Sequence, residues 1–294
     1  MIDVKNLTKK YENIAAVDGI SFKVSKGEVF GLLGPNGAGK TTTVEILEGL
    51  RKPSSGEATI NNFDVSKETK KVKSIIGVQL QSVNFFEELS LSEIVELFAD
   101  LYSSTVDSNE ILDRVGLLKK KDSYFKPLSG GQKQRLSIAV ALVNNPKVLF
   151  FDEPTTGLDP QARRNMWDLI KSFQKDGKTI VLTTHYMEEA EILCDRVAII
   201  KNGQIIAEDK MADLKKKSIN RIEVQFSKDF DVDKFRKNIG ISKVTGDSNK
   251  YTFDIEGNID KFIKELANHE IENLKTIEPD LEDIFLSYYR EQKG

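Results

Sequence analysis

The chain has 294 residues, of which 30% are charged and 39% are hydrophobic, and its formal net charge at pH 7 is −3. A chain of this length can bury a large core and holds more than one domain, and without a strong basic stripe it offers no groove for nucleic acid. No apolar run approaches the roughly 20 residues that span a bilayer, and the single cysteine, Cys194, excludes an internal disulfide and fits a reducing compartment.

The first predicted elements surround a glycine-rich loop. Residues 28–33 form an apolar, β-prone run that is typical of a buried strand. The loop after it can curl so that successive backbone N–H groups point inward, at the N-terminus of a helix that begins near Lys40. The loop consists of Gly34, Pro35, Asn36, Gly37, Ala38 and Gly39. A strand, a glycine-rich loop and a helix in this order predict a cradle for a nucleotide polyphosphate.

Three side chains at the start of this helix suit a bound nucleotide. Lys40 would place its ammonium group on the β- and γ-phosphates, the Thr41 hydroxyl would ligate Mg²⁺, and Thr42 is placed to bond the α-phosphate. The alternative is a glycine-rich turn before an ordinary helix. Because every fixed position of the motif matches in the right context, we favour the cradle.

Residues 86–145 are predicted to be mostly helical, with apolar residues at helical spacing in 91–99. Residues 128–132 read Leu-Ser-Gly-Gly-Gln and precede a helix that runs through 133–142 and stops near 145–146. Ser129 and Gln132 form a capping-box pattern for this helix. Gly130 and Gly131 would also let backbone N–H groups at the exposed helix N-terminus approach a γ-phosphate closely, and both interpretations can hold.

Two adjacent carboxylates end the next predicted strand, at residues 148–153. Its four apolar residues fit a parallel strand that is buried on both faces. Buried carboxylates are costly without partners, and ligands bind at this end of an open α/β sheet. We therefore expect Asp152 to contact Mg²⁺ through water and Glu153 to act as the general base. The alternative, a solvated acidic turn, is disfavoured by the cradle.

The α/β core is predicted to continue over residues 146–206 as strand, helix and strand, consistent with a parallel sheet. His185 follows the strand at 179–184, whereas the other histidine, His269, follows no buried strand. A lone histidine after a strand is ordinarily a surface residue, so this position alone assigns no function.

The last part of the chain changes in character after a turn at residues 201–204. Residues 211–220 are rich in charge and indicate a helix or a linker. Strands are then predicted at 221–226, 241–244, 251–255 and 271–277, with helices around 232–239 and 259–266. This βαββαβ order predicts a small ferredoxin-like domain. A final helix is expected from Leu281.

These motifs together resemble the nucleotide-binding subunit of an ATP-binding-cassette (ABC) transporter, over about residues 2–210. The resemblance implies an α/β fold with a P-loop NTPase core, a parallel sheet and a helical subdomain at about 86–145, and an accessory domain at 211–294. It implies that the chain is an ATPase whose cofactors are ATP and Mg²⁺. It also implies a head-to-tail dimer, in which Ser129, Gly131 and Gln132 of one copy cover the ATP held at Lys40 of the other.

Further residues match the family one at a time. Tyr11 matches the aromatic residue that stacks on adenine, although by itself it would be an ordinary edge-strand aromatic. Gln81 matches the glutamine that joins the Mg²⁺ shell, and Gln79 is a competing candidate. Asp159 matches the loop that acts across the dimer, and His185 matches the histidine that contacts the γ-phosphate.

The resemblance also implies a partner in the membrane. In the family, a short helix of a separate transmembrane permease enters the cleft between core and helical subdomain, and Phe85, Phe86 and Leu89 are candidates for lining it or for the subdomain core. Residues 281–286 resemble the end of the drug-resistance and multidrug-export branch, which implies export. With no secretory signal expected at the N-terminus, the chain would be cytoplasmic, on the inner face of the cell membrane.

Two other classes of protein fit the sequence less well. A soluble ABC ATPase of DNA repair or translation would carry a long coiled coil or two cassettes, but the sequence shows neither sustained heptads nor a second cradle. A P-loop GTPase or kinase is disfavoured by residues 128–132 and by Tyr11, which suits adenine stacking. Nothing in the sequence indicates the transported substrate, or whether two identical cassettes pair.

Overall fold

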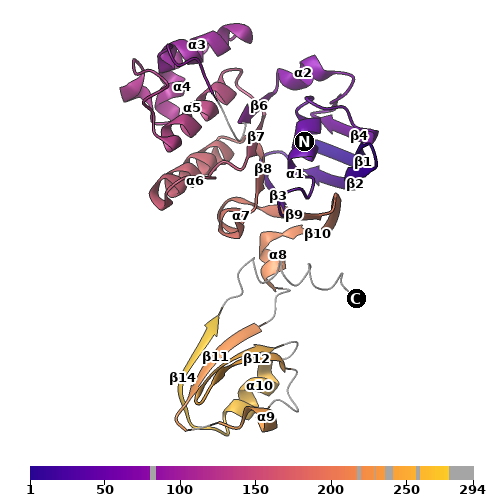
Figure 1. The fold of residues 1–294 in the computed structure, drawn as a ribbon, viewed down its shortest axis with the longest axis vertical. Coiled ribbons are helices and arrows are strands. Elements are labelled where there is room, and N and C mark those ends of the chain that lie inside the picture. Colours follow the sequence, from indigo (N-terminus) through magenta and orange to yellow (C-terminus); the bar gives the residue numbers. More distant parts are fainter. Residues whose placement is uncertain (80–83, 217–219, 229, 236–240, 256–258, 278–294) are drawn as a thin grey trace. The chain divides into compact units, whose positions relative to one another are not determined.

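A computed structural model describes residues 1–79, 84–216, 220–228, 230–235, 241–255 and 259–277 (Figure 1). The chain divides into two compact units, Met1–Met211 and Ala212–Gly294. No helix within these described residues is long and apolar enough to cross a membrane.

A six-stranded sheet forms the centre of the first unit, in the order β10-β9-β3-β8-β7-β6. All neighbours are parallel except β10, which is antiparallel to β9. Every residue of β3, β7 and β8 is buried, which explains why their sequences are mainly apolar, with polar residues only at the ends of β7 and β8. The strands are β3 (Val29–Leu33), β6 (Ile76–Gln79), β7 (Val148–Asp152), β8 (Thr179–Thr184), β9 (Arg196–Lys201) and β10 (Gln204–Lys210).

A second, antiparallel sheet has the order β2-β1-β4-β5. Its apolar residues join those of β3, β7 and α1 in one hydrophobic cluster, so the cradle is held between two sheets. The strands are β1 (Ile2–Tyr11), β2 (Ile14–Val24), β4 (Ser55–Ile60) and β5 (Phe63–Asp64). The helices beside the two sheets are α1 (Lys40–Leu47), α2 (Thr69–Lys73), α6 (Pro160–Lys175) and α7 (Met187–Leu193).

A group of helices lies between β6 and β7 in the sequence and packs together (Figure 1). It comprises α3 (Leu91–Leu101), α4 (Ser108–Arg114), the 3₁₀ turn Leu118–Lys120 and α5 (Gly130–Leu142). Phe85 packs edge-on against Phe98 and Phe125, so it belongs to the core of this group, whereas Phe86 is 60% exposed.

The second unit contains a four-stranded antiparallel sheet in the order β12-β13-β11-β14. With the element order βαββαβ, this is the predicted ferredoxin-like arrangement. Its elements are β11 (Asn220–Phe226), α9 (Val232–Phe235), β12 (Ile241–Asp247), β13 (Lys250–Ile255), α10 (Ile259–Leu266) and β14 (Ile271–Ile277). The charged segment before it begins with α8 (Met211–Lys216). The helix expected from Leu281 lies outside the described residues.

Candidate functional site: a nucleotide cradle with two buried carboxylates

The glycine-rich loop connects the end of β3 to the start of α1, and two of its glycines are required by close approaches. A Cβ atom on Gly39, whose φ is 106°, would lie 2.3 Å from the carbonyl oxygen of Ala16. A Cβ atom on Gly34 would lie 2.4 Å from the carbonyl oxygen of Ile200. Gly39 is the N-cap of α1 and supplies no side-chain cap, so the first N–H groups of the helix are available to an anion.

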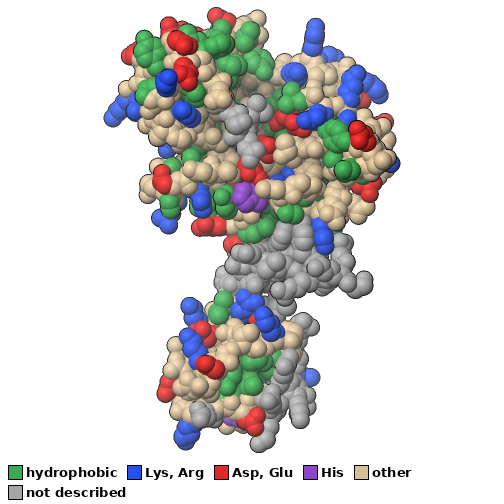
Figure 2. Space-filling model, in the orientation of Figure 1, with side chains coloured by type: hydrophobic (Ala, Val, Ile, Leu, Met, Phe, Trp, Pro, Cys, Tyr) green, Lys and Arg blue, Asp and Glu red, His purple; other side chains and the backbone are tan. Residues whose placement is uncertain are grey.

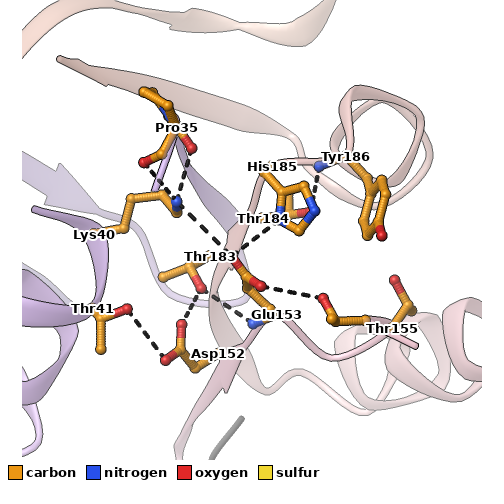
Figure 3. A network of polar contacts seen from close by, with 12 residues as sticks. Pro35, Lys40, Thr41, Asp152, Glu153, Thr155, Thr183, Thr184, His185 and Tyr186 are labelled. Atoms are coloured by element: carbon orange, nitrogen blue, oxygen red, sulfur yellow. Dashed lines mark hydrogen bonds and ion pairs between the residues drawn. The ribbon is translucent and has the colours of Figure 1, made fainter. Parts of the chain in front are cut away.

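Lys40 lies inside this loop and is only 5% exposed. Its Nζ donates hydrogen bonds to the carbonyl oxygens of Gly34 (2.8 Å) and Pro35 (3.1 Å), and it lies 3.9 Å from Oε1 of Glu153 (Figure 3). Burial lowers the pKa of Lys40, while the carboxylates of Glu153 and Asp152 oppose that effect. A lysine ammonium group beside the uncapped N-terminus of α1 is suited to a polyphosphate.

Asp152, at the end of β7, links the cradle to the neighbouring strand β8. The Thr41 hydroxyl donates to Oδ2 of Asp152 at 3.4 Å, and the Thr183 hydroxyl donates to Oδ1 (Figure 3). Burial raises the pKa of Asp152, against the hydrogen bond from Thr183. Among the described residues, no group of three or more His, Cys, Asp or Glu side chains is arranged so that it could hold a metal ion by itself. One hydroxyl beside one carboxylate fits Mg²⁺ that takes its other ligands from phosphate and water.

Glu153 follows directly and sits among polar groups from three segments. Its Oε1 lies 3.1 Å from Nδ1 of His185, and its Oε2 accepts a hydrogen bond from the Thr156 hydroxyl at 3.2 Å. Its backbone N–H donates to the carbonyl oxygen of Thr183 at 3.1 Å. Glu153 has φ 49°, in the left-handed region that non-glycine residues rarely adopt. Such strained positions concentrate at functional sites, where the surroundings hold them.

The turn before α5 has the capping box that the sequence predicts. The Ser129 side chain accepts from the backbone N–H of Gln132 at 3.4 Å, and the Gln132 side chain accepts from the backbone N–H of Ser129 at 3.0 Å. Ser129 and Gly130 are exposed, and a Cβ atom on Gly130 would meet nothing within 4 Å. The turn belongs to the helical group and not to the cradle (Figure 1), and it lies beside α6, where a Cβ atom on Gly131 would be 3.4 Å from the Cβ atom of Ala162.

The remaining predicted residues lie around this centre. Tyr11, at the end of β1, is 39% exposed, with the cations of Lys9 and Arg51 at 5.1 and 5.7 Å from its ring centroid. Asp159 is the N-cap of α6, and its Oδ1 accepts from the N–H groups of residues 161 (3.0 Å) and 162 (2.9 Å). Gln81 lies outside the described residues, whereas its competitor Gln79 is fully buried on β6.

Sequence reasoning missed two groups in the site. Thr183 supports both Asp152 and Glu153, and a pair of threonines that ends an otherwise apolar strand was a signal for it. Glu48, at the C-terminal end of α1, is only 3% exposed. Burial raises its pKa to about 8, with smaller contributions from Asp152 and Glu45. No pattern in the sequence distinguished Glu48 from Glu45.

A cradle, a buried lysine and paired carboxylates at the ends of parallel strands define a P-loop nucleotide triphosphatase. Comparisons with known proteins agree with this class. The family model described as ABC transporter matches residues 17–156, and one described as AAA domain, putative AbiEii toxin, Type IV TA system, matches residues 124–189. The linearmycin resistance ATP-binding protein LnrL of Bacillus subtilis is 35% identical over 98% of this chain and 97% of its own length.

Two further comparisons extend the match. The Nod factor export ATP-binding protein I of Burkholderia pseudomallei is 44% identical over 70% of each chain. A dimeric ATP-binding cassette, MJ0796, bound to ADP and Pi has a TM-score of 0.66 and 32% identity, over 72% of this chain and 99% of that one. The chain therefore belongs to the ABC transporter family, as an ATP-binding subunit that hydrolyses ATP. This confirms the family, the fold class and the ATPase activity that the sequence predicts.

Proposed function

We propose that two copies of this chain close head to tail around two Mg-ATP and so power a separate membrane permease. In this proposal residues 1–210 are the cassette, and residues 211–294 are an accessory domain. The observation that carries the proposal is the meeting of Lys40, Glu153 and His185 at one edge of the sheet. Nζ of Lys40 lies 3.9 Å and Nδ1 of His185 lies 3.1 Å from Oε1 of Glu153.

Each of these groups has a distinct part in hydrolysis. The cradle and Lys40 bind the β- and γ-phosphates, and Thr42 bonds the α-phosphate. Thr41 and Asp152, with Gln81 as the family implies, would hold Mg²⁺, which neutralises charge on the phosphates. Glu153 takes a proton from water as the water oxygen bonds to the γ-phosphorus and the bond from that phosphorus to the bridging oxygen breaks. His185 contacts the γ-phosphate and orients Glu153 through Nδ1.

The second copy completes each site. The exposed turn at Ser129 and Gly130, with Gly131 and Gln132, presents helix N–H groups that would cover the γ-phosphate of the opposite copy. Asp159 would contribute to the same interface, and Tyr11 would stack on adenine. Support comes from the dimeric cassette that this chain resembles. Because ATP binds the closed pair more tightly than the open one, binding can supply work to a partner.

Hydrophobic side chains gather on the surface of the helical group, where a permease would dock (Figure 2). Leu101 of α3 is 72% exposed, and Leu50 is 55% exposed. A cavity of about 240 Å³ is lined by Leu50 together with Phe98 and Tyr102. The name of the Nod factor export relative supports export as the direction. A chain that powers a membrane permease would lie on the inner face of the cell membrane, where ATP is available.

The substitution Glu153→Gln tests the mechanism. It keeps the shape of the side chain but removes the proton acceptor, so phosphate release should stop while ATP binding persists. ATP-bound dimers should then accumulate, as measured by light scattering in the presence of Mg-ATP. Glu188→Gln, an exposed carboxylate on α7, is the matched control and should behave as wild type. Hydrolysis by Glu153→Gln at the wild-type rate would exclude Glu153 as the base.

Copurification tests the partner. A tagged chain from detergent-solubilised membranes should bring down a polytopic membrane protein in stoichiometric amount. Ribosomes or soluble proteins alone, with the chain absent from membranes, would favour the soluble ABC ATPase instead.

A further inference from the structure

A buried carboxylate outside the nucleotide cradle, Glu189, is bonded to the loop that follows Glu153. Glu189 belongs to the first turn of α7 and is fully buried. Its Oε1 accepts a hydrogen bond from the Thr155 hydroxyl at 2.7 Å and another from the indole N–H of Trp167 at 3.1 Å. A buried carboxylate costs free energy unless such donors satisfy it, so this arrangement calls for a reason.

The donor Thr155 lies in the loop that carries the proposed base. Thr155 is two residues after Glu153 and is itself fully buried. The next residue, Thr156, donates its hydroxyl hydrogen to Oε2 of Glu153, and its N–H bonds the carbonyl oxygen of Glu153 at 3.2 Å. The bond from Thr155 to Glu189 therefore anchors a loop whose first residue is in a strained conformation at φ 49°.

Glu189 is also tied to the segment that carries His185. That segment runs from Thr184 directly into α7, and the Tyr186 N–H donates to the Thr184 hydroxyl at 2.9 Å (Figure 3). The rings of His185 and Tyr186 lie 4.1 Å apart, centroid to centroid. Only Tyr186, the N-cap of α7, separates His185 from the helix whose first turn carries Glu189, so the position of this helix constrains where the histidine lies.

We infer that Glu189 is a positioning residue that joins the Glu153 loop to the His185 segment, and so keeps these two side chains at their 3.1 Å separation. Trp167 adds a third point of attachment, on α6, whose N-cap is Asp159. The inference rests on the proposed hydrolytic roles of Glu153 and His185. The hydrogen-bond donors to Glu189, Thr155 and Trp167, both lie outside the cradle.

The kinetic test compares Glu189→Ala, Glu189→Gln and the control Glu188→Gln, which removes a charge from the same turn of α7. Glu189→Ala should lower kcat on the order of tenfold or more, because small misplacements of catalytic groups are that costly. The KM for ATP and the affinity for nucleotide should stay at the wild-type value, since Lys40 and its loop are untouched. Glu189→Gln keeps an oxygen acceptor for both donors and should retain most of the kcat.

The Thr155→Val variant tests the hydrogen bond from Thr155 to Glu189. Valine cannot donate, so this variant should lower kcat as Glu189→Ala does. The double variant should lose no more kcat than Glu189→Ala alone, because Glu189→Ala already breaks the bond from Thr155. Additive losses, an unchanged kcat in Glu189→Ala, or a parallel loss of kcat and nucleotide affinity would each overturn the inference.

A measurement that does not depend on ATP hydrolysis distinguishes the failure of this inference from the failure of the proposed function. Hydrogen exchange in Glu189→Ala should speed up over residues 153–159 and 184–187 but not over residues 34–42. Trp167 is the only tryptophan of the chain, so its emission should shift when its acceptor is removed. If the wild type failed to hydrolyse ATP, the proposed function would be wrong, and unchanged exchange over both loops would still overturn the inference by itself.

Discussion

The buried carboxyl of Glu48 should make the stability of the first unit depend on pH in a predictable direction. Its pKa is raised from its ordinary value of 4.5 to about 8, chiefly by burial. Between these two pH values the folded protein holds a proton that the unfolded chain has released. Rising pH therefore destabilises the folded state, and the stabilisation present below pH 4.5 is lost as the pH rises through 8.

The size of this effect follows from the shift. Each pKa unit corresponds to about 1.4 kcal/mol, so the full shift of Glu48 amounts to about 5 kcal/mol between pH 4 and pH 9. Glu48→Gln removes the titrating group and keeps its shape. The unfolding free energy of this variant, relative to the wild type, should grow by about that amount across the range. The cost of burying the amide is the same at every pH and cancels.

The unfolding free energy can be measured by urea unfolding, followed by the fluorescence emission of Trp167. This residue is the only tryptophan and reports on the first unit alone. Wild type, Glu48→Gln and the control Glu57→Gln, an exposed carboxylate on β4, would be compared at intervals of one pH unit, without nucleotide. If the unfolding free energies of the wild type and Glu48→Gln changed in parallel with pH, the buried carboxyl of Glu48 would not be the cause of the pH dependence.

Three further predictions concern the cradle and the loop after Glu153. Lys40→Ala should weaken ATP binding, as measured by titration calorimetry, and an unchanged affinity would contradict the cradle. Gly39→Ala should destabilise the protein by more than Gly37→Ala in urea unfolding. Both glycines have positive φ, but only a Cβ atom on Gly39 meets a backbone oxygen, at 2.3 Å. Equal losses of unfolding free energy in the two variants would exclude the close approach as the cause. Asp159→Ala removes the N-cap of α6 and should cost about 1 kcal/mol of stability; no loss would mean that water replaces the cap.

The local features of this protein could be predicted from its sequence because they depend on neighbours along the chain. The cradle follows from the order of strand, glycines and lysine, and the capping box at Ser129 from residues three apart. The ferredoxin-like order of the second unit follows from hydrophobic periodicity, and its strands lie within a few residues of the prediction.

Only the tertiary structure decided which side chains meet and how deeply they are buried. Glu153 and His185 are 32 residues apart in the chain, and their contact depends on β7 and β8 being neighbours in the sheet. The raised pKa of Glu48 and the bonds of Glu189 depend on burial by residues from distant segments. A periodic pattern shows that a residue faces a core, but it does not identify the groups that surround it there.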